Sequence, residues 1–344
     1  MHSVRTGGGL LAEMVRLANA VAGTAGGELT MLSHRSGGGA VIRVGAVVVK
    51  AHPRGDDPAT LAARLRLATD AALVPVLVPP LAIPGGPVLG VDRLSADRLG
   101  TDALGTGGLG GDRLSADRLN GWAARIDGRL VTAWPAGEPV PIDDPDAAPW
   151  EDGARLLARL HGTPAPSRNG LPPHGGPARV ERALARARAV GGSAAAVVER
   201  AYETVPAVTA GPRTLVHGDW HLGQLVRGAG GDPGWRLVDV DDLGTGDPVW
   251  DLARPAALFA AGVLDPQAWH RFLGAYCWAG GAALPADRDP WTVLDAPARA
   301  LAVQLAAGGV ATAADEGRPL DEFEIALLDA CRRMATVGGP ADVS

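Results

Sequence analysis

Two neighbouring segments constrain this chain most strongly: "TLVHGDWHLGQLV" (214–226) and "WRLVDVDDLGTGDPVWDLA" (235–253). In each, a short apolar run typical of a buried strand leads into an aspartate, Asp219 in the first and Asp239 in the second. "GQLV" and "RLVDV" can pair as a hairpin across the turn-forming "RGAGGDPG". This pairing predicts that Asp219, Gln224 and Asp239 meet at one edge.

Two carboxylates and an amide supply the hard oxygen ligands that suit a Mg²⁺ ion carrying substrate phosphates, and one carboxylate can serve as a base. A rival interpretation is a hydrolytic metal site, because His217 and His221 lie four residues apart around Asp219. The loop lies between strands, and the chain's 8 histidines form no second cluster. The pattern therefore favours the oxygen-ligand interpretation, with His221 in packing or in contact with the ligands.

The N-terminal part reads as a helix followed by strands. Residues 8–22 have helical spacing, and 28–52 read as strand, glycine loop, strand, turn and strand. Asp57 and Pro58 open a helix to about residue 70, after which the prolines of 72–82 allow only an edge strand or an extended link. The Asp127–Gly128 turn in 122–137 predicts another hairpin.

The pattern is mostly helical after residue 149, so strands gather early and helices late, which predicts an α+β fold. We expect an N-terminal nucleotide-binding lobe over 1–135 and a C-terminal catalytic and acceptor-binding helical lobe over 136–344. "DRLSADRL" occurs at 92–99 and again at 112–119 around a glycine-rich spacer. We interpret 92–119 as a duplicated surface insertion, because two copies are too few for a solenoid.

Together, "HGDWHLGQ" and "LVDVDD…GDPVWDLA" resemble the aminoglycoside phosphotransferase and choline-kinase-like superfamily. Gln224 stands where the family has an asparagine, and in this respect the chain resembles actinobacterial maltokinase-like and glucosamine-kinase-like members. The resemblance implies a protein-kinase-like, two-lobed fold with a small N-terminal antiparallel sheet lobe and a larger helical C-terminal lobe. It also implies roles for individual residues: Asp219 as catalytic base or orienter of the acceptor hydroxyl, His217 as the brace of that loop, Gln224 and Asp239 as Mg²⁺ ligands, and Asp251 as an anchor of the loop.

The same resemblance implies a nucleotide site for ATP or GTP. The glycine turn Gly37, Gly38 and Gly39 would cover the phosphates with backbone N–H groups, and Lys50 would hold them. Backbone groups of Thr132 to Trp134 would meet the purine. The helix after Lys50 lacks the glutamate that pairs with this lysine in the family, and Asp70 is its only late acid.

We therefore expect a small-molecule kinase that phosphorylates a hydroxyl of a sugar, amino sugar or antibiotic. A nucleotide-binding pseudokinase or regulatory module is the alternative, and a metallohydrolase is the third. The acids of 315–324 could bind a cationic amine of the acceptor or could form a solvated helix cap. Antibiotic resistance, sugar salvage and biosynthetic tailoring all remain open as its role.

Composition bounds the partners and the setting. The formal net charge is −6 without a long Lys/Arg run, and no apolar run approaches the ~20 residues of a spanning helix, so we expect no nucleic-acid or membrane partner. Only 2 cysteines occur, far apart, which favours a reducing cytoplasm over a disulfide framework. We expect a cytoplasmic monomer or homodimer.

Overall fold

The computed structural model describes residues 7–24, 26–34, 39–83, 121–141, 147–164, 171–207 and 211–337. Gly37, Gly38 and the repeat at 92–119 lie outside these described residues. Contacts divide the chain into two compact units. The first unit comprises the described parts of Met1–Pro139 and Arg168–Leu171, together with Val226–Val240. The second comprises those of Val140–Ser167, Pro172–Leu225 and Asp241–Ser344.

The first unit is built on a five-stranded antiparallel sheet with the order β1-β2-β3-β5-β4. Its strands are β1 (Leu29–His34), β2 (Ala40–Val44), β3 (Val47–Ala51), β4 (Ala123–Ile126) and β5 (Arg129–Pro135). Burial alternates along β2 and β3, because successive side chains of a strand point to opposite faces of the sheet. Asp127 and Gly128 both take positive φ, so the predicted Asp-Gly hairpin turn is confirmed.

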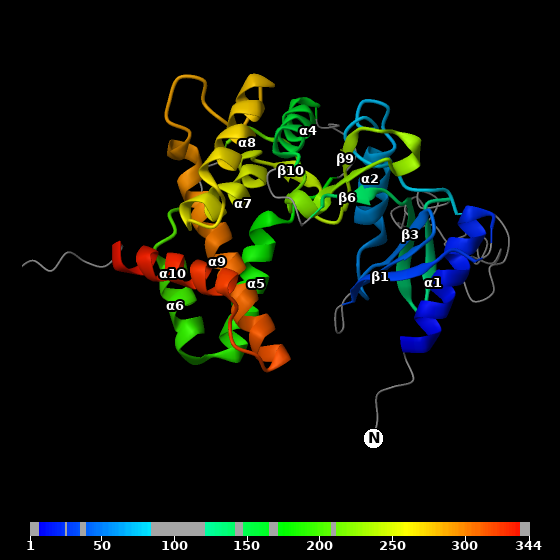
Figure 1. Ribbon diagram of the computed structural model, residues 1–344, viewed down its shortest axis with the longest axis horizontal. Helices are drawn as coiled ribbons and strands as arrows, with labels where there is room; N and C mark the ends of the chain where they lie inside the picture. The colour runs from blue at the N-terminus through cyan, green and yellow to red at the C-terminus, as the bar shows by residue number, and fades with distance from the viewer. Residues whose placement is uncertain are drawn as a thin grey trace, which may run out of the picture. The chain divides into compact units, whose positions relative to one another are not determined.

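Two helices accompany this sheet (Figure 1). Helix α1 (Gly7–Ala22) packs on β2 and β3 through Met14, Leu17 and Ala18, which are fully buried. Helix α2 (Pro58–Ala68) begins at Asp57, whose carboxylate accepts from the backbone N–H groups of Ala59 and Thr60. Both helices were predicted from apolar spacing, and Asp57 is a normal N-cap residue.

A second, three-stranded sheet has the order β6-β8-β9, with β6 (Glu138–Pro139), β8 (Leu225–Arg227) and β9 (Trp235–Leu237). The predicted hairpin from "GQLV" to "RLVDV" is therefore confirmed. Leu77 forms a parallel bridge with Leu237 and lies outside any regular strand, as the prolines around it led us to expect. The expected boundary at residue 135 stays a prediction; by contacts, the hairpin from Val226 to Val240 belongs to the first unit.

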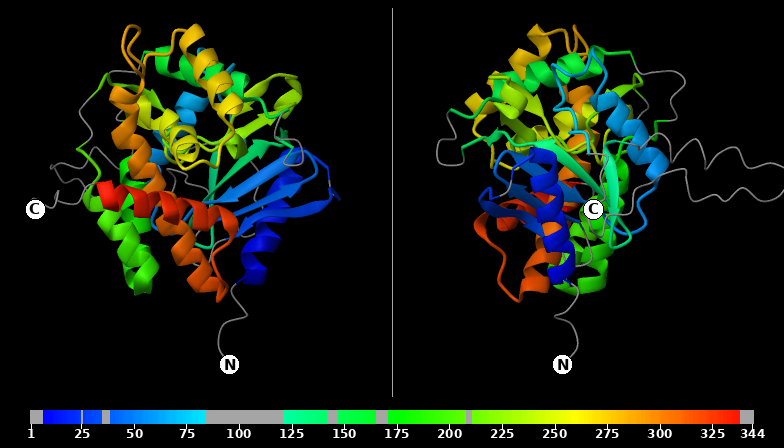
Figure 2. Two further views of the ribbon diagram at one scale, coloured as in Figure 1. Left: turned by 60° about the vertical axis from the view of Figure 1, so that its left-hand side comes forward. Right: turned by 90° about the vertical axis from the view of Figure 1, so that its right-hand side faces the viewer.

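The second unit is mainly helical. Its helices are α4 (Trp150–Gly162), α5 (Gly176–Val190), α6 (Gly192–Glu203), α7 (Val249–Ala260), α8 (Pro266–Trp278), α9 (Trp291–Glu316) and α10 (Glu322–Val337). Helix α9 contacts α5, α6, α7 and α10, and α10 lies across it in Figure 1 and in the left view of Figure 2. Leu184, Val198, Val303 and Leu327 form the core between these helices. A small antiparallel pair, β7 (Thr214–Val216) and β10 (Gly244–Gly246), completes the unit.

The mixed fold predicted from the sequence, an antiparallel sheet unit and a larger helical unit, is thus confirmed. Among the described helices, none is both long enough and apolar enough to cross a bilayer.

Candidate functional site

The loop that follows β7 carries the predicted catalytic residues. His217 is fully buried directly after the strand, and Trp220 is almost fully buried three residues later. The Trp220 ring stacks on Phe272 of α8, with ring centroids 4.9 Å apart and planes inclined by 23°. This stacking fastens the loop to α8. Asp219, the residue before Trp220, therefore has little freedom to move.

The carboxylate of Asp251, in the first turn of α7, fastens the backbone of this loop. Its Oδ2 accepts from the backbone N–H of His217 at 2.7 Å, and its Oδ1 accepts from that of Gly218 at 2.8 Å. Gly218 has a φ of +85°, a conformation that favours glycine. The prediction that Asp251 anchors the loop by hydrogen bonds is confirmed.

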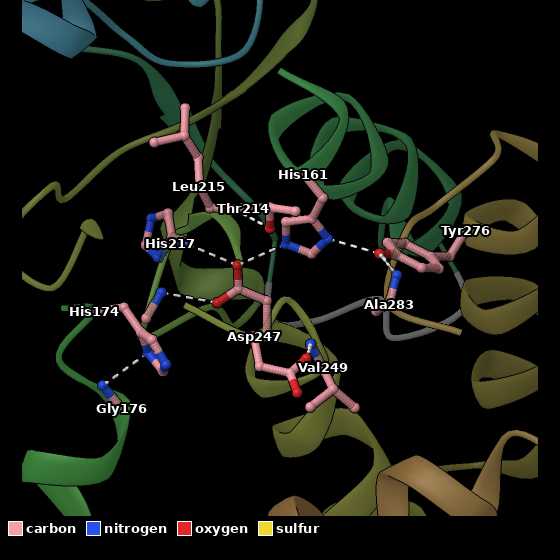
Figure 3. A network of polar contacts seen from close by, with 12 residues as sticks. His161, His174, Gly176, Thr214, Leu215, His217, Asp247, Val249, Tyr276 and Ala283 are labelled. Atoms are coloured by element: carbon pink, nitrogen blue, oxygen red, sulfur yellow. Dashed lines mark hydrogen bonds and ion pairs between the residues drawn. The ribbon is translucent and has the colours of Figure 1, made fainter. Parts of the chain in front are cut away.

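A buried hydrogen-bond network that includes His161 and Tyr276 supports Asp251 (Figure 3). His161 Nε2 lies 3.0 Å from Asp251 Oδ2, and His161 Nδ1 lies 2.6 Å from the hydroxyl of Tyr276, which accepts from the backbone N–H of Ala283 at 3.0 Å. Because the tyrosine oxygen already accepts, its proton can point to Nδ1, which leaves Nε2–H to donate to Asp251. Every donor in this hydrogen-bond network then has an acceptor.

Burial and these contacts shift the pKa values of the network. Burial acts to raise the pKa of Asp251, but the hydrogen bond from His161, the nearby imidazoles and the N–H of Gly218 outweigh it and leave the pKa below its usual value. Burial raises the pKa of Tyr276 well above that of an exposed phenol. Asp251 is therefore a carboxylate at neutral pH, as an acceptor for two backbone N–H groups must be.

Asp219 itself lies between two arginines. Arg254 of α7 places Nη2 at 2.6 Å from Oδ1 of Asp219, and Arg179 of α5 places Nη2 at 2.8 Å from Oδ2. Burial lowers the pKa of Arg254, against the opposing effect of Asp219, but a guanidinium remains charged at neutral pH. The predicted catalytic carboxylate thus has one cation on each oxygen, and neither arginine was identified from the sequence.

In the first unit, the structure brings Lys50 and Asp239 together. Lys50 Nζ lies 2.6 Å from Asp239 Oδ1. Asp70, the candidate partner by sequence, instead accepts from the backbone N–H of Ala72. Asp239 has a φ of +66°, which is uncommon for a residue other than glycine and is often found at functional sites. Asp239 therefore supplies the carboxylate next to Lys50 that α2 lacks.

Lys50 also has a sequence signal that was missed: it is the only lysine among the 32 basic residues. In a chain that otherwise uses arginine everywhere, a single lysine points to a position that suits a compact ammonium group. Phosphate binding is one use of such a point charge.

Gly39, Thr132 and Trp134 are the other predicted nucleotide residues that the structure describes. Thr132 faces Lys50 across the β3–β5 register, and its Oγ1 accepts from Trp134 Nε1 at 2.9 Å. A Cβ at Gly39 would lie 2.6 Å from the carbonyl oxygen of Ala51, so the chain needs a glycine here to pass β3. Whether Thr132 and Trp134 meet a purine stays a prediction.

The oxygen-bearing side chains fit the predicted metal in chemistry. Asp239 is only partly buried and offers a carboxylate, and Gln224 is buried at the end of a short 3₁₀ turn, Leu222–Gln224. Asp219 and Gln224 belong to one unit and Asp239 to the other, so their convergence on one ion stays a prediction.

The rival histidine site gains no support. His221 Nδ1 accepts from the backbone N–H of Gly223 at 3.1 Å, as an N-cap does. Over the described ranges, no group of three or more His, Cys, Asp or Glu side chains is arranged to hold a metal ion.

A family comparison matches the central part of the chain. The model of the phosphotransferase enzyme family (APH) matches residues 113–291, which include both segments that carry the site. The chain belongs to this family. Membership places the chain among the phosphotransferase enzymes. No curated protein matches the chain in sequence.

Solved structures of similar fold agree with this membership. A choline/ethanolamine kinase family protein from Mesorhizobium loti is 18% identical, with a TM-score of 0.50 over 95% of this chain and 94% of its own. A protein from Ralstonia eutropha named as an aminoglycoside phosphotransferase is 14% identical, with a TM-score of 0.51 over 95% and 96%. A GDP complex of a mutant aminoglycoside 2′-phosphotransferase is 13% identical, with a TM-score of 0.50 over 93% and 96%. At such identities they show the fold alone, and no particular similarity to maltokinases or glucosamine kinases emerges.

Proposed function

We propose that this APH-family protein is a nucleotide- and Mg²⁺-dependent kinase that transfers the γ-phosphoryl group to a hydroxyl of a sugar, amino sugar or antibiotic. The observation that carries the proposal is the fastening of the Asp219 loop by Asp251 through the N–H groups of His217 and Gly218. Phosphoryl transfer depends mostly on positioning and charge neutralisation, and a rigid loop supplies the first of these.

Each residue has a defined part in this proposal. Asp219 accepts a hydrogen bond from the acceptor hydroxyl, orients its oxygen and takes up its proton. Lys50 binds phosphate oxygens of the nucleotide, and Asp239 and Gln224 would hold Mg²⁺. When bound, Mg²⁺ neutralises charge on the phosphates. The donor is ATP or GTP; the GDP bound to one structural neighbour is in keeping with a nucleoside triphosphate.

The direct test is a coupled nucleotide-consumption assay against sugars, amino sugars, aminoglycosides and nucleoside antibiotics. Asp219→Asn should lower kcat by about 10²–10⁴-fold with any acceptor that wild type uses, because the orienting and proton-accepting carboxylate is gone. Asp315→Asn is the matched control, since Asp315 is exposed and pairs with Arg186 on the helical surface. Unchanged turnover in Asp219→Asn would show that the assignment is wrong.

The same assay separates the alternative function. Mg²⁺-dependent nucleotide binding without turnover of any acceptor would indicate a regulatory nucleotide-binding module instead. The absence of a helix acid next to Lys50 motivates this alternative, whereas the pairing of Lys50 with Asp239 weakens it.

A further inference from the structure

Asp219 belongs to a set of four charged side chains, two carboxylates and two guanidinium groups. Asp219 pairs with Arg254 and Arg179, and Arg179 also places Nη1 at 2.9 Å from Oδ2 of Asp242. The four side chains are between 14% and 24% exposed, so water screens their charges only partly. The two negative and two positive charges of these four side chains cancel one another.

The arrangement is built into the backbone of the second unit. A Cβ at Gly175 would lie 1.7 Å from Asp242 Oδ1, and a Cβ at Gly218 would lie 2.4 Å from the Asp242 carbonyl oxygen. Side chains at these two positions would push Asp242 away and release Arg179. Two glycines therefore make the room that keeps the four charges together.

This arrangement bears on the acceptor, because Asp219 must touch the reacting hydroxyl. Groups that flank this hydroxyl approach Arg254 and Arg179 as well. An ammonium group there would meet two guanidinium groups and no uncompensated carboxylate, whereas a neutral hydroxyl oxygen could accept an N–H. We propose that the acceptor is uncharged around its reacting hydroxyl, a neutral polyhydroxyl compound rather than a polycationic one. The inference rests on the proposed kinase function and narrows its substrate class.

A second observation on a different element points the same way. The acids of 315–324 were candidates for binding a cationic amine, yet several of them already lie beside an arginine. Asp315 lies 2.8 Å from Arg186, and Arg318 contacts both Glu316 at 2.6 Å and Glu324 at 2.7 Å. Each of these three carboxylates thus has an arginine beside it, with Arg318 shared between two of them.

The test compares neutral sugars with their 2-amino counterparts, such as glucose with glucosamine, by kcat/KM. Wild type should prefer the neutral member by about tenfold or more. The reason is that the ammonium group of the amino sugar and the guanidinium groups of the partly buried site repel each other. Arg254→Gln should narrow this gap by freeing one carboxylate, and Arg254→Lys should keep it. Arg188→Gln, the same charge change at an exposed position of α5, should leave the ratio unaltered.

A binding measurement decides the inference even without turnover. Calorimetric titration of the wild-type protein with kanamycin, a polycation, should show no binding that depends on Asp219. Binding that Asp219→Asn abolishes, or a neutral-to-amine ratio below tenfold, would overturn the inference and leave the kinase function standing. If no compound is phosphorylated, the proposed function fails, and the calorimetry still decides whether polycations are excluded. Circular dichroism melting of each variant verifies that it folds.

Discussion

At the residue scale, a single buried carboxylate links the fold to the chemistry. Asp251 accepts two backbone N–H groups of the predicted catalytic loop and is itself supported by His161 and Tyr276. A buried polar chain of this kind rigidifies its surroundings when every member is satisfied, and each missing member leaves a buried group unpaired. The position of Asp219 therefore depends on residues that never touch a substrate.

Tyr276→Phe tests this dependence. The change leaves the N–H of Ala283 and Nδ1 of His161 without their shared partner, so we expect a loss of about 1–3 kcal/mol in the free energy of unfolding. It should also lower kcat while changing the KM of either substrate less, because the loop loses a supporting hydrogen bond while the binding groups remain.

The chain provides its own control for this substitution. Tyr202, the other of its 2 tyrosines, is on the surface and donates to Glu181. Tyr202→Phe should change neither stability nor kcat by much, as measured by urea unfolding and steady-state kinetics. Equal effects of the two substitutions would contradict a special role for the buried chain.

At the element scale, helix α9 organises the second unit by contacting four other helices. Its residues are mostly small and apolar on all sides, as is typical of a buried helix. Small side chains let neighbouring helices approach closely, and α10 crosses α9 where two glycines stand side by side, Gly308 and Gly309.

These two glycines predict opposite effects of the same substitution. Nothing lies within 4 Å of a Cβ at Gly308, so Gly308→Ala should stabilise the protein by about 0.5–1 kcal/mol through helix propensity. A Cβ at Gly309 would lie 2.8 Å from Cγ of Glu324, whose carboxylate is held by Arg318. Gly309→Ala should therefore destabilise it by about 1–3 kcal/mol. Thermal unfolding of both variants measures the difference. Stabilisation by both would contradict the prediction and show that α10 can shift to make room for the added methyl group.

At the scale of the whole molecule, the predicted tasks divide between the two units. Lys50 and Asp239 belong to the first unit, while Asp219 and the residues that hold it belong to the second. Nucleotide binding and acceptor activation should therefore respond to different substitutions.

Lys50→Arg tests this division while preserving charge. A guanidinium is larger and planar, so we expect nucleotide affinity to fall by about tenfold or more although the chain uses arginine everywhere else. Asp219→Asn should leave nucleotide affinity unchanged. A fluorescent-nucleotide displacement assay with and without Mg²⁺ measures both. An amine-selective label, which has only one lysine to modify, should be excluded from Lys50 by bound nucleotide. Unchanged affinity in Lys50→Arg would remove Lys50 from the nucleotide site.

Much of the fold was predictable because its signals are local. Runs of β-branched residues on either side of Gly45 predicted β2 and β3, the Asp127–Gly128 pair predicted the β4–β5 turn, and Asp57 predicted the start of α2. The anchoring role of Asp251 also followed from its motif. The same local rules could not identify the supports of the site: His161 occupies an ordinary position in an amphipathic helix, and Arg179 and Arg254 are two of many arginines.

By itself, the sequence determined which strands and helices form, where the segments predicted to be catalytic and nucleotide-binding begin, and which residue types they carry. Only the tertiary structure decided which side chains meet: Lys50 with Asp239 rather than Asp70, and Asp219 with two arginines. The physical reason is that backbone periodicity and turn preferences act over a few neighbouring residues. An ion pair across 189 positions, such as Lys50 with Asp239, exists only after packing has brought its elements together.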